Sequence, residues 1–119
     1  MDIALDPFPF NGATTTFEAM TMGMPVITLL GSNFVDRVAA SIATHAGFPE
    51  FIAKTKDDYV ALAVEMASDP VKLNALRQGM RDALHQSDIC DSEPYARSVE
   101  AAFRDMWRTW IETGGYKEI

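Results

Sequence analysis

A short apolar run, Val26-Ile27-Thr28-Leu29-Leu30, restricts the fold of this chain more than any other feature. The run has the length of a strand and starts with β-branched residues. Gly23 and Pro25 separate it from the helical pattern before it, because glycine ends a helix and proline prevents its restart. A strand that is apolar on both faces suits a parallel sheet covered by helices on both sides. The chain is therefore predicted to be an α/β protein.

The pattern before this run predicts one strand, one loop and one helix. Met1–Leu5 is expected to form a buried strand, and the prolines and glycine within Asp6–Ala13 predict a loop. Thr14 or Thr15 can cap the helix that follows, and Glu18 stands where the positive end of that helix favours an acid.

The pattern after the run is mostly helical. A helix is expected from Asn33, with Asp36 as the acid of a variant capping box, and Phe51-Ile52-Ala53 is the candidate third strand. Three more helices are predicted: one after Thr55, one after Asp69-Pro70 and a final amphipathic one after a break at Ile89–Pro94. This alternation implies right-handed parallel crossovers in a sheet of two or three short strands.

The predicted sheet is narrow for an open parallel architecture. The chain has 119 residues, which suffice for one domain with its own core. We therefore interpret it as the C-terminal half of a larger nucleotide-binding lobe, in which helices predominate. Residues 1–53 are expected to form the nucleotide-binding α/β part, and residues 54–119 a helical C-terminal part.

Composition argues against several classes of function. The net charge of −7 argues against nucleic acid or an anionic membrane as a partner. No apolar run approaches the roughly 20 residues that span a bilayer, and the N-terminus lacks the layout of a signal peptide. Cys90 is the single cysteine, which favours a reducing cytoplasm. The two histidines, His45 and His85, show no metal-site spacing.

The segment Asn11–Glu18 carries the clearest signal of function. Gly12 permits close backbone approach, and the free amide groups of a helix that begins near Thr14 can hold a phosphate. Glu18, one turn further on, is placed to reach a sugar hydroxyl. This arrangement outlines a nucleotide site. Asp6, at the end of a strand, is a catalytic candidate by position, although capping of the loop is the favoured role.

Several longer segments together match one family. They are Leu5–Thr16, Gly23–Leu29, Phe34–Ser41 and Gly47–Ala53, with Met106-Trp107 near the end. Over nearly its whole length the chain resembles O-GlcNAc-transferase-type and SPINDLY-type enzymes of glycosyltransferase family 41. Glu18-Ala19-Met20, followed by Gly23 and Pro25, is also similar to the acidic-helix signature of many GT-B glycosyltransferases.

The resemblance implies a two-lobed GT-B catalytic region joined to tetratricopeptide repeats, with UDP-GlcNAc held in the lobe to which this chain corresponds. Ala13, Thr14 and Thr15 match the positions that hold the diphosphate. Glu18 matches the acid that pairs with the ribose hydroxyls, and Asn11 and Gly12 shape the approach loop. The intact enzyme is expected to move GlcNAc to Ser or Thr of proteins, with no metal or other cofactor.

The chain also departs from the family pattern. Ala13 stands where animal members have histidine and bacterial members often have glycine. Glu18 replaces the aspartate of the animal enzymes, so its ribose contact would come from a longer arm. Phe10 stands where many retaining GT-B enzymes carry a glutamate, which favours inverting transfer. The leaving-group cations and acceptor site of the family lie upstream of Met1, so no catalytic residue is expected here and the isolated chain is expected to be inactive.

Two other functions stay open on the sequence. One is a GT-B transferase for another nucleotide sugar, since most of the sugar pocket lies outside the chain. The other is a non-catalytic protein-interaction module that uses the acidic surface and the last helix. The resemblance implies that this helix, with Phe103, Trp107 and Trp110 on one face, packs on the other lobe of the enzyme. We therefore expect an exposed or self-associated apolar patch on this chain.

Overall fold

The computed structural model describes residues 1–114, and its elements follow the predicted alternation of strands and helices. The strands are β1 (Ala4–Leu5), β2 (Val26–Leu29) and β3 (Ile52–Ala53). The α-helices are α1 (Thr14–Thr21), α2 (Val38–His45), α3 (Lys56–Ser68), α4 (Pro70–His85) and α5 (Ser92–Thr113). Short 3-10 turns are η1 (Phe34–Asp36), η2 (Pro49–Phe51) and η3 (Asp88–Cys90).

The three strands form one parallel sheet in the order β1-β2-β3. Ala4 pairs with Val26, and Thr28 pairs with Ile52. β2 is the central strand, and Val26, Ile27 and Thr28 are buried in it, as its apolar pattern predicts. The expected α/β fold, with a short parallel sheet and predominant helices, is confirmed.

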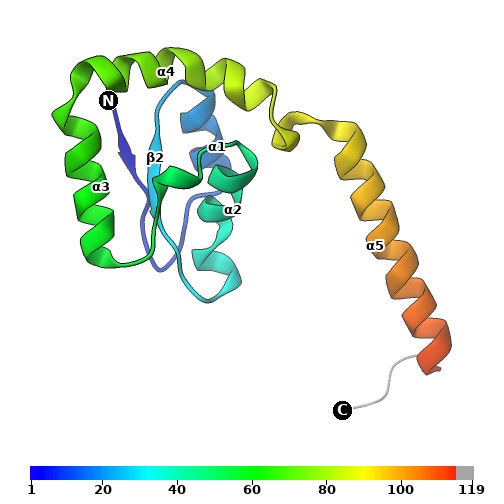
Figure 1. Ribbon diagram of the computed structural model, residues 1–119. Coiled ribbons are helices and arrows are strands. Elements are labelled where there is room, and N and C mark those ends of the chain that lie inside the picture. The colour runs from blue at the N-terminus through cyan, green and yellow to red at the C-terminus, as the bar shows by residue number, and fades with distance from the viewer. Residues whose placement is uncertain (115–119) are drawn as a thin grey trace.

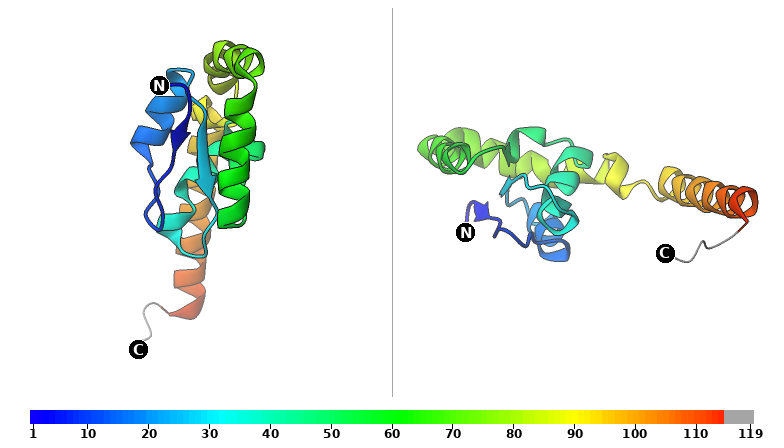
Figure 2. Two further views of the ribbon diagram at one scale, coloured as in Figure 1. Left: turned by 90° about the vertical axis from the view of Figure 1, so that its left-hand side faces the viewer. Right: turned by 90° about the horizontal axis from the view of Figure 1, so that it is seen from below.

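Helices cover both faces of this sheet. Figure 1 shows α1 and α2 on one side of the strands and α3 on the other, and the left view of Figure 2 shows the strands between α1 and α3. Both α1 and α3 pack against β2, and α4 packs against α1 and α3. The core lies where these elements meet, and its fully buried side chains include Met20, Ile27, Phe51, Met80 and Leu84.

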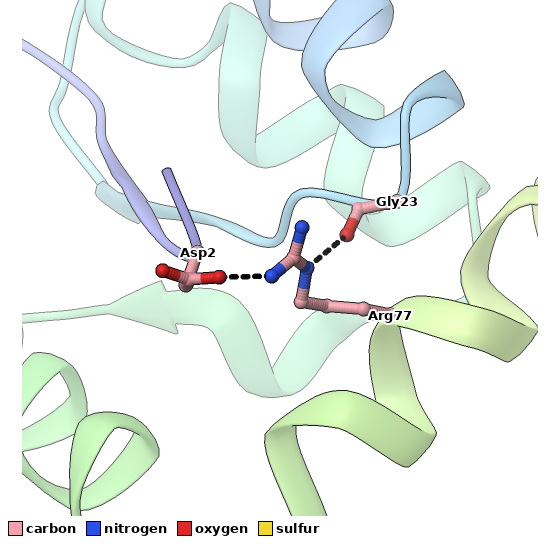
Figure 3. A network of polar contacts seen from close by, with 3 residues as sticks. All are labelled: Asp2, Gly23 and Arg77. Atoms are coloured by element: carbon pink, nitrogen blue, oxygen red, sulfur yellow. Dashed lines mark hydrogen bonds and ion pairs between the residues drawn. The ribbon is translucent and has the colours of Figure 1, made fainter. Parts of the chain in front are cut away.

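A polar contact holds α4 against the edge at which the strands begin. Gly23 ends α1 with a φ of 70°, and a Cβ atom there would lie 2.6 Å from the Arg77 backbone oxygen, so only glycine fits. Arg77 Nε donates to the Gly23 carbonyl oxygen at 3.1 Å, and its guanidinium also pairs with Asp2 (Figure 3). α4 therefore covers the end of the sheet at which the strands begin, and the loops at the carboxyl ends of the strands lie at the opposite end.

The last helix, α5, extends away from the rest of the chain as an arm (Figures 1 and 2). The radius of gyration is 17.8 Å, whereas a compact domain of this length has about 13.5 Å. The arm has no buried residue, and its exposed large apolar side chains are Tyr95, Phe103, Met106, Trp107, Trp110 and Ile111. The expected exposed apolar patch is therefore present. No helix within residues 1–114 is long and apolar enough to cross a membrane.

Several predicted boundaries are wrong. The strand expected over Met1–Leu5 is limited to Ala4–Leu5, and Leu5 is exposed because β1 is an edge strand of the described sheet. Asp36 does accept a hydrogen bond from the Asn33 amide at 2.6 Å, but residues 34–36 form the 3-10 turn η1, and the α-helix α2 begins only at Val38.

Two later boundaries also differ from the prediction. Phe51 belongs to the turn η2 rather than to β3, and α5 begins inside the expected break, at Ser92. Asp91 caps this start by accepting from the Glu93 amide. The division into parts at residue 53 stays a prediction, and residues 115–119 of its second part lie outside the described residues.

Candidate functional site

The candidate site lies where β1 ends and α1 begins. Residues 6–13 form the connecting loop, at the edge of the sheet opposite α4 (Figure 1). The Phe8–Pro9 peptide bond in this loop is cis. In open parallel sheets, ligands bind outside the carboxyl ends of the strands, which is where this loop lies.

Asp6 anchors the loop to the sheet. It is 3% exposed, its Oδ1 atom accepts from the Gly12 amide at 2.8 Å, and its Oδ2 atom accepts from Thr28 Oγ1 at 2.7 Å. Burial raises the pKa of the Asp6 carboxyl above its ordinary 3.8, and the hydrogen bonds from Gly12 and Thr28 act in the opposite direction. Both oxygens are thus used by the chain itself, which favours the predicted capping role over a catalytic one.

Gly12 leaves no room for a side chain at the turn into α1. A Cβ atom there would lie 2.5 Å from Thr16 Oγ1, 2.9 Å from Thr15 Oγ1 and 3.2 Å from Asp6 Oδ1. The backbone of the turn therefore lies directly against the first turn of the helix. This close approach is the physical reason for glycine at this position.

Asn11 ties the same turn to the loop that follows β2. It is 4% exposed, its backbone amide donates to the Val35 carbonyl at 3.0 Å, and its side-chain Nδ2 donates to the Pro7 carbonyl at 3.2 Å. The Asn11 Oδ1 atom is buried and has no hydrogen-bond partner within residues 1–114. Folded proteins rarely leave such an acceptor unpaired. The turn therefore retains a hydrogen-bond acceptor that could be used by a donor group from outside these residues.

The start of α1 differs from the prediction. Ala13, not Thr14 or Thr15, is the N-cap residue, and no side chain caps the helix. Thr14 and Thr15 are its first two residues and are exposed. The amides of residues 14–16 precede the first helical hydrogen bond, which joins the Phe17 amide to the Ala13 carbonyl at 3.1 Å. Because alanine has no side-chain oxygen, the positive end of α1 stays uncapped beside exposed threonines.

Glu18 lies on the same face of α1 as these threonines. It is three residues after Thr15 and four after Thr14, the spacings that place side chains together on a helix. Glu18 is exposed and lies beyond the first helical turn. The predicted stabilisation by the helix dipole is weak there, because that effect falls off within the first turn. The Glu18 carboxylate is therefore expected to contribute little to the stability of α1.

Three side chains around the loop were not recognised from the sequence. Thr28 was read as part of an apolar strand, but its hydroxyl donates to Asp6. Tyr59 of α3 carries no local signal of a site role, but its hydroxyl donates to the Asp6 carbonyl at 2.9 Å. Lys56 begins α3, and its Nζ atom lies 5.6 Å from the centre of the Phe8 ring. A polar residue within a buried strand, as at Thr28, is the one signal that was available.

The six predicted site residues, Asn11–Thr15 and Glu18, thus lie together at one edge of the sheet. Asn11 and Gly12 are held by the chain, whereas Ala13, Thr14, Thr15 and Glu18 face solvent. The surface combines free amides, hydroxyls and one carboxylate, which are groups that bind a phosphate and a sugar hydroxyl.

Comparison with known proteins gives this surface a context. Residues 1–99 match the family described as glycosyl transferase family 41. The chain is 42% identical over 112 residues to a barley (Hordeum vulgare) protein named probable UDP-N-acetylglucosamine–peptide N-acetylglucosaminyltransferase SPINDLY. It is 31% identical over 109 residues to a UDP-N-acetylglucosamine–peptide N-acetylglucosaminyltransferase of Caenorhabditis elegans. These alignments cover 94% and 92% of this chain but only 12% and 10% of the two relatives.

A solved structure resembles this chain as well. A mutant O-GlcNAc transferase from Thermobaculum terrenum superposes on it with a TM-score of 0.85 and 34% sequence identity. The superposition covers 97% of this chain and 22% of that protein. Both the fold and the sequence are thus shared with part of a much longer protein.

Proposed function

The chain belongs to glycosyl transferase family 41, and from this premise we propose that it forms the donor-binding part of a protein O-GlcNAc transferase. In this proposal Ala13, Thr14 and Thr15 bind the diphosphate of UDP-GlcNAc, and Glu18 binds the ribose hydroxyls. Asn11 and Gly12 shape the turn that brings the backbone close to the diphosphate.

The uncapped start of α1 is the observation that carries this proposal. Its free amides and positive helix end attract an anion, and the exposed hydroxyls of Thr14 and Thr15 add further donors. Glu18 stands on the same helix face, one turn away, where it can accept hydrogen bonds from a diol. Relatives named for UDP-N-acetylglucosamine make a nucleotide sugar the natural ligand for these groups.

The proposed reaction is an inverting transfer. The hydroxyl oxygen of a Ser or Thr acceptor forms a bond to the anomeric carbon of GlcNAc on the face opposite the diphosphate. The bond between that carbon and the diphosphate breaks, UDP departs with the electron pair, and the hydroxyl proton passes to a base outside this chain. The start of α1 stabilises the charge that develops on the departing diphosphate, so we propose that the transfer needs no bound metal.

The proposal assigns further parts to the intact protein. A second catalytic lobe would supply the acceptor site, the base and the cations for the leaving group, and tetratricopeptide repeats would precede the catalytic region. We propose that this other lobe covers the arm. We place the protein in a bacterial cytoplasm, because Ala13 is small like the glycine of bacterial members and Cys90 is unpaired within residues 1–114.

Titration of the ¹⁵N-labelled chain with UDP, followed by amide chemical shifts, tests the donor site. We expect shifts at residues 12–18 and weak binding, because much of the base and sugar pocket is absent. Glu18→Gln should weaken binding by about 10-fold, the loss expected for a hydrogen bond to a charged group. Glu100→Gln, on the exposed arm, is the matched control and should leave binding unchanged. A fully folded chain whose residues 12–18 do not respond to UDP would contradict the proposal.

Two alternatives are separated by the same titration. A transferase for another nucleotide sugar predicts a response at residues 12–18 to a different nucleotide, so GDP is included as a second ligand. A non-catalytic interaction module is favoured only by the exposed aromatic face of the arm. It predicts no response to either nucleotide.

A further inference from the structure

The turn that carries the proposed diphosphate contacts is held from both faces of the sheet. α1 begins on one side of the strands, whereas Tyr59 belongs to α3 on the other side (Figure 1). Tyr59 Oη donates to the Asp6 backbone oxygen at 2.9 Å, and its ring meets the Phe8 ring edge-on, with 5.6 Å between the centroids. Tyr59 thus contacts both the first residue of the loop and one of its aromatic residues.

The Asp6 side chain continues this connection to the turn itself. Its Oδ1 atom accepts from the Gly12 amide, and its Oδ2 atom accepts from the fully buried Thr28 hydroxyl at the centre of the sheet. The backbone of Asp6 is therefore held by Tyr59 of α3 and by β2, where the Asp6 backbone amide donates to the Ile27 carbonyl at 2.9 Å, and its carboxylate is held by Thr28 of β2. Burial and the nearby Asp6 charge raise the pKa of Tyr59 above its ordinary 10.0, so the hydroxyl keeps the proton that it donates.

The turn lies close to the start of α1. A Cβ atom at Gly12 would lie 2.5 Å from Thr16 Oγ1 and 2.9 Å from Thr15 Oγ1, so these side chains would have to shift to admit one. A binding group must be held to within about 0.5 Å of its productive position, and side chains that contact no ligand commonly supply that precision. Asp6 and Tyr59 occupy such supporting positions, because their polar atoms contact the chain around the turn.

We propose that Asp6 and Tyr59 are positioning residues for the nucleotide-sugar donor. The Asp6 carboxylate sets the direction of the Gly12 turn, and Tyr59 sets it from the opposite face of the sheet. The affinity for the nucleotide sugar therefore depends on the Tyr59 hydroxyl of α3, which does not contact the nucleotide sugar itself. The link to the donor rests on the proposed function, whereas the effect on the turn can be measured without any ligand.

The test uses the 119-residue chain with conservative variants. Tyr59→Phe removes only the hydroxyl, and Tyr95→Phe on the exposed arm is its control. Asp6→Asn keeps an oxygen for the Gly12 amide, whereas Asp6→Ala removes it. Two quantities are measured well below the melting temperature: hydrogen exchange of the Gly12 amide, and UDP affinity from the titration described above.

We expect Tyr59→Phe to speed Gly12 exchange and to weaken UDP binding, each by about 3- to 10-fold, the usual effect of one lost hydrogen bond. Tyr95→Phe should change neither quantity. Asp6→Asn should retain more protection of Gly12 than Asp6→Ala, and should also move the Gly12 amide proton resonance. If Asp6→Ala does not fold, Asp6→Asn and Tyr59→Phe still decide the question.

Two results overturn the proposal. One is a lower melting temperature in Tyr59→Phe with unchanged Gly12 exchange, which would make Tyr59 a purely structural residue. The other is faster exchange with unchanged UDP affinity, which would separate the turn from donor binding. If the unsubstituted chain does not respond to UDP, the donor-site proposal fails. Positioning of the turn is then supported by faster Gly12 exchange in the variants and rejected by unchanged exchange.

Discussion

The body of the molecule, from β1 to α4, and the arm α5 are stabilised in different ways. The body buries Met20, Met80 and Leu84 completely, and its helices pack against one sheet. The arm buries no residue and is stabilised along its own length. Asp91 caps its start, Gly114 ends it in the left-handed conformation, and ion pairs such as Arg104–Glu100 lie along its surface.

This difference shows which part of the chain holds the core. In the body, helices pack on both faces of a sheet of three short strands and bury its central strand, so a core forms without the arm. The arm instead presents an aromatic stripe that includes the stacked pair Trp107 and Trp110, whose centroids lie 5.4 Å apart. An exposed apolar face of this kind is typical of a surface that packs on another molecule or domain. The body thus contains the buried core of the chain, and the arm is an extension whose apolar face is exposed.

The largest expected effect comes from truncating the same residue type in each region. Met80→Ala should lower the free energy of unfolding by about 2–5 kcal/mol, because it removes a fully buried side chain and leaves a cavity. Met106→Ala, on the arm where Met106 is 64% exposed, should change it by less than about 0.5 kcal/mol. Urea unfolding followed by far-ultraviolet circular dichroism measures both. Equal losses would show that the arm is packed in solution.

A second test concerns the buried Asp6 carboxyl of the body and the dependence of stability on pH that its burial should produce. The pKa of Asp6 is raised in the folded chain, so in a window above 3.8 the folded chain holds a proton that the unfolded chain has released. The contribution of Asp6 to stability is therefore full below pH 3.8 and is lost as the pH rises through the folded pKa. Asn does not titrate.

The stability of Asp6→Asn relative to the unsubstituted chain should therefore increase as the pH is raised from about 3 to about 7. Melting temperatures of both proteins across this range measure the difference. A difference that stays constant with pH would show that the Asp6 carboxyl is not desolvated in solution.

The smallest expected effect concerns the ion pairs of the arm. Glu100→Gln removes an ion pair in which Arg104 Nη2 lies 3.7 Å from Glu100 Oε2. Both side chains are well exposed. Such a pair contributes about 0.3–0.5 kcal/mol to helix stability, and salt screens it. Faster hydrogen exchange in the arm at low salt, absent at high salt, is the expected result. Hydrogen exchange in the body should be the same in both proteins and serves as the control. Faster exchange in the arm that persists at high salt would show that Glu100 has a role beyond the ion pair.

The sequence was sufficient for the order of elements and insufficient for the support of the site. The run Val26–Leu30 predicts a parallel strand covered on both faces because its apolar pattern is local, and Asp69-Pro70 correctly places the start of α4. The support of the loop depends instead on residues distant in the chain. Thr28 and Asp6 are 22 positions apart, and Tyr59 and Asp6 are 53 apart. No local pattern reports such pairs.

The start of α1 shows a second limit of local patterns. Threonines before a helical segment predict a side-chain cap, but the chain enters α1 at Ala13, and Thr14 and Thr15 lie inside the helix. The Gly12 turn, held by Asp6, determines where the helix begins. A hydrogen bond within the loop, from the Gly12 amide to Asp6, therefore competes with the capping preference, and the helix end stays free.

Both tryptophans of this protein lie on the arm, and this placement separates two optical signals. Intrinsic tryptophan emission reports the surroundings of Trp107 and Trp110 alone, while the body contributes tyrosine signals from residues such as Tyr59. Emission should move to shorter wavelengths when a covering surface buries the arm, and should stay unchanged when a nucleotide occupies the distant loop. A single fluorescence cuvette can thus distinguish assembly of the larger protein from binding of its small-molecule donor.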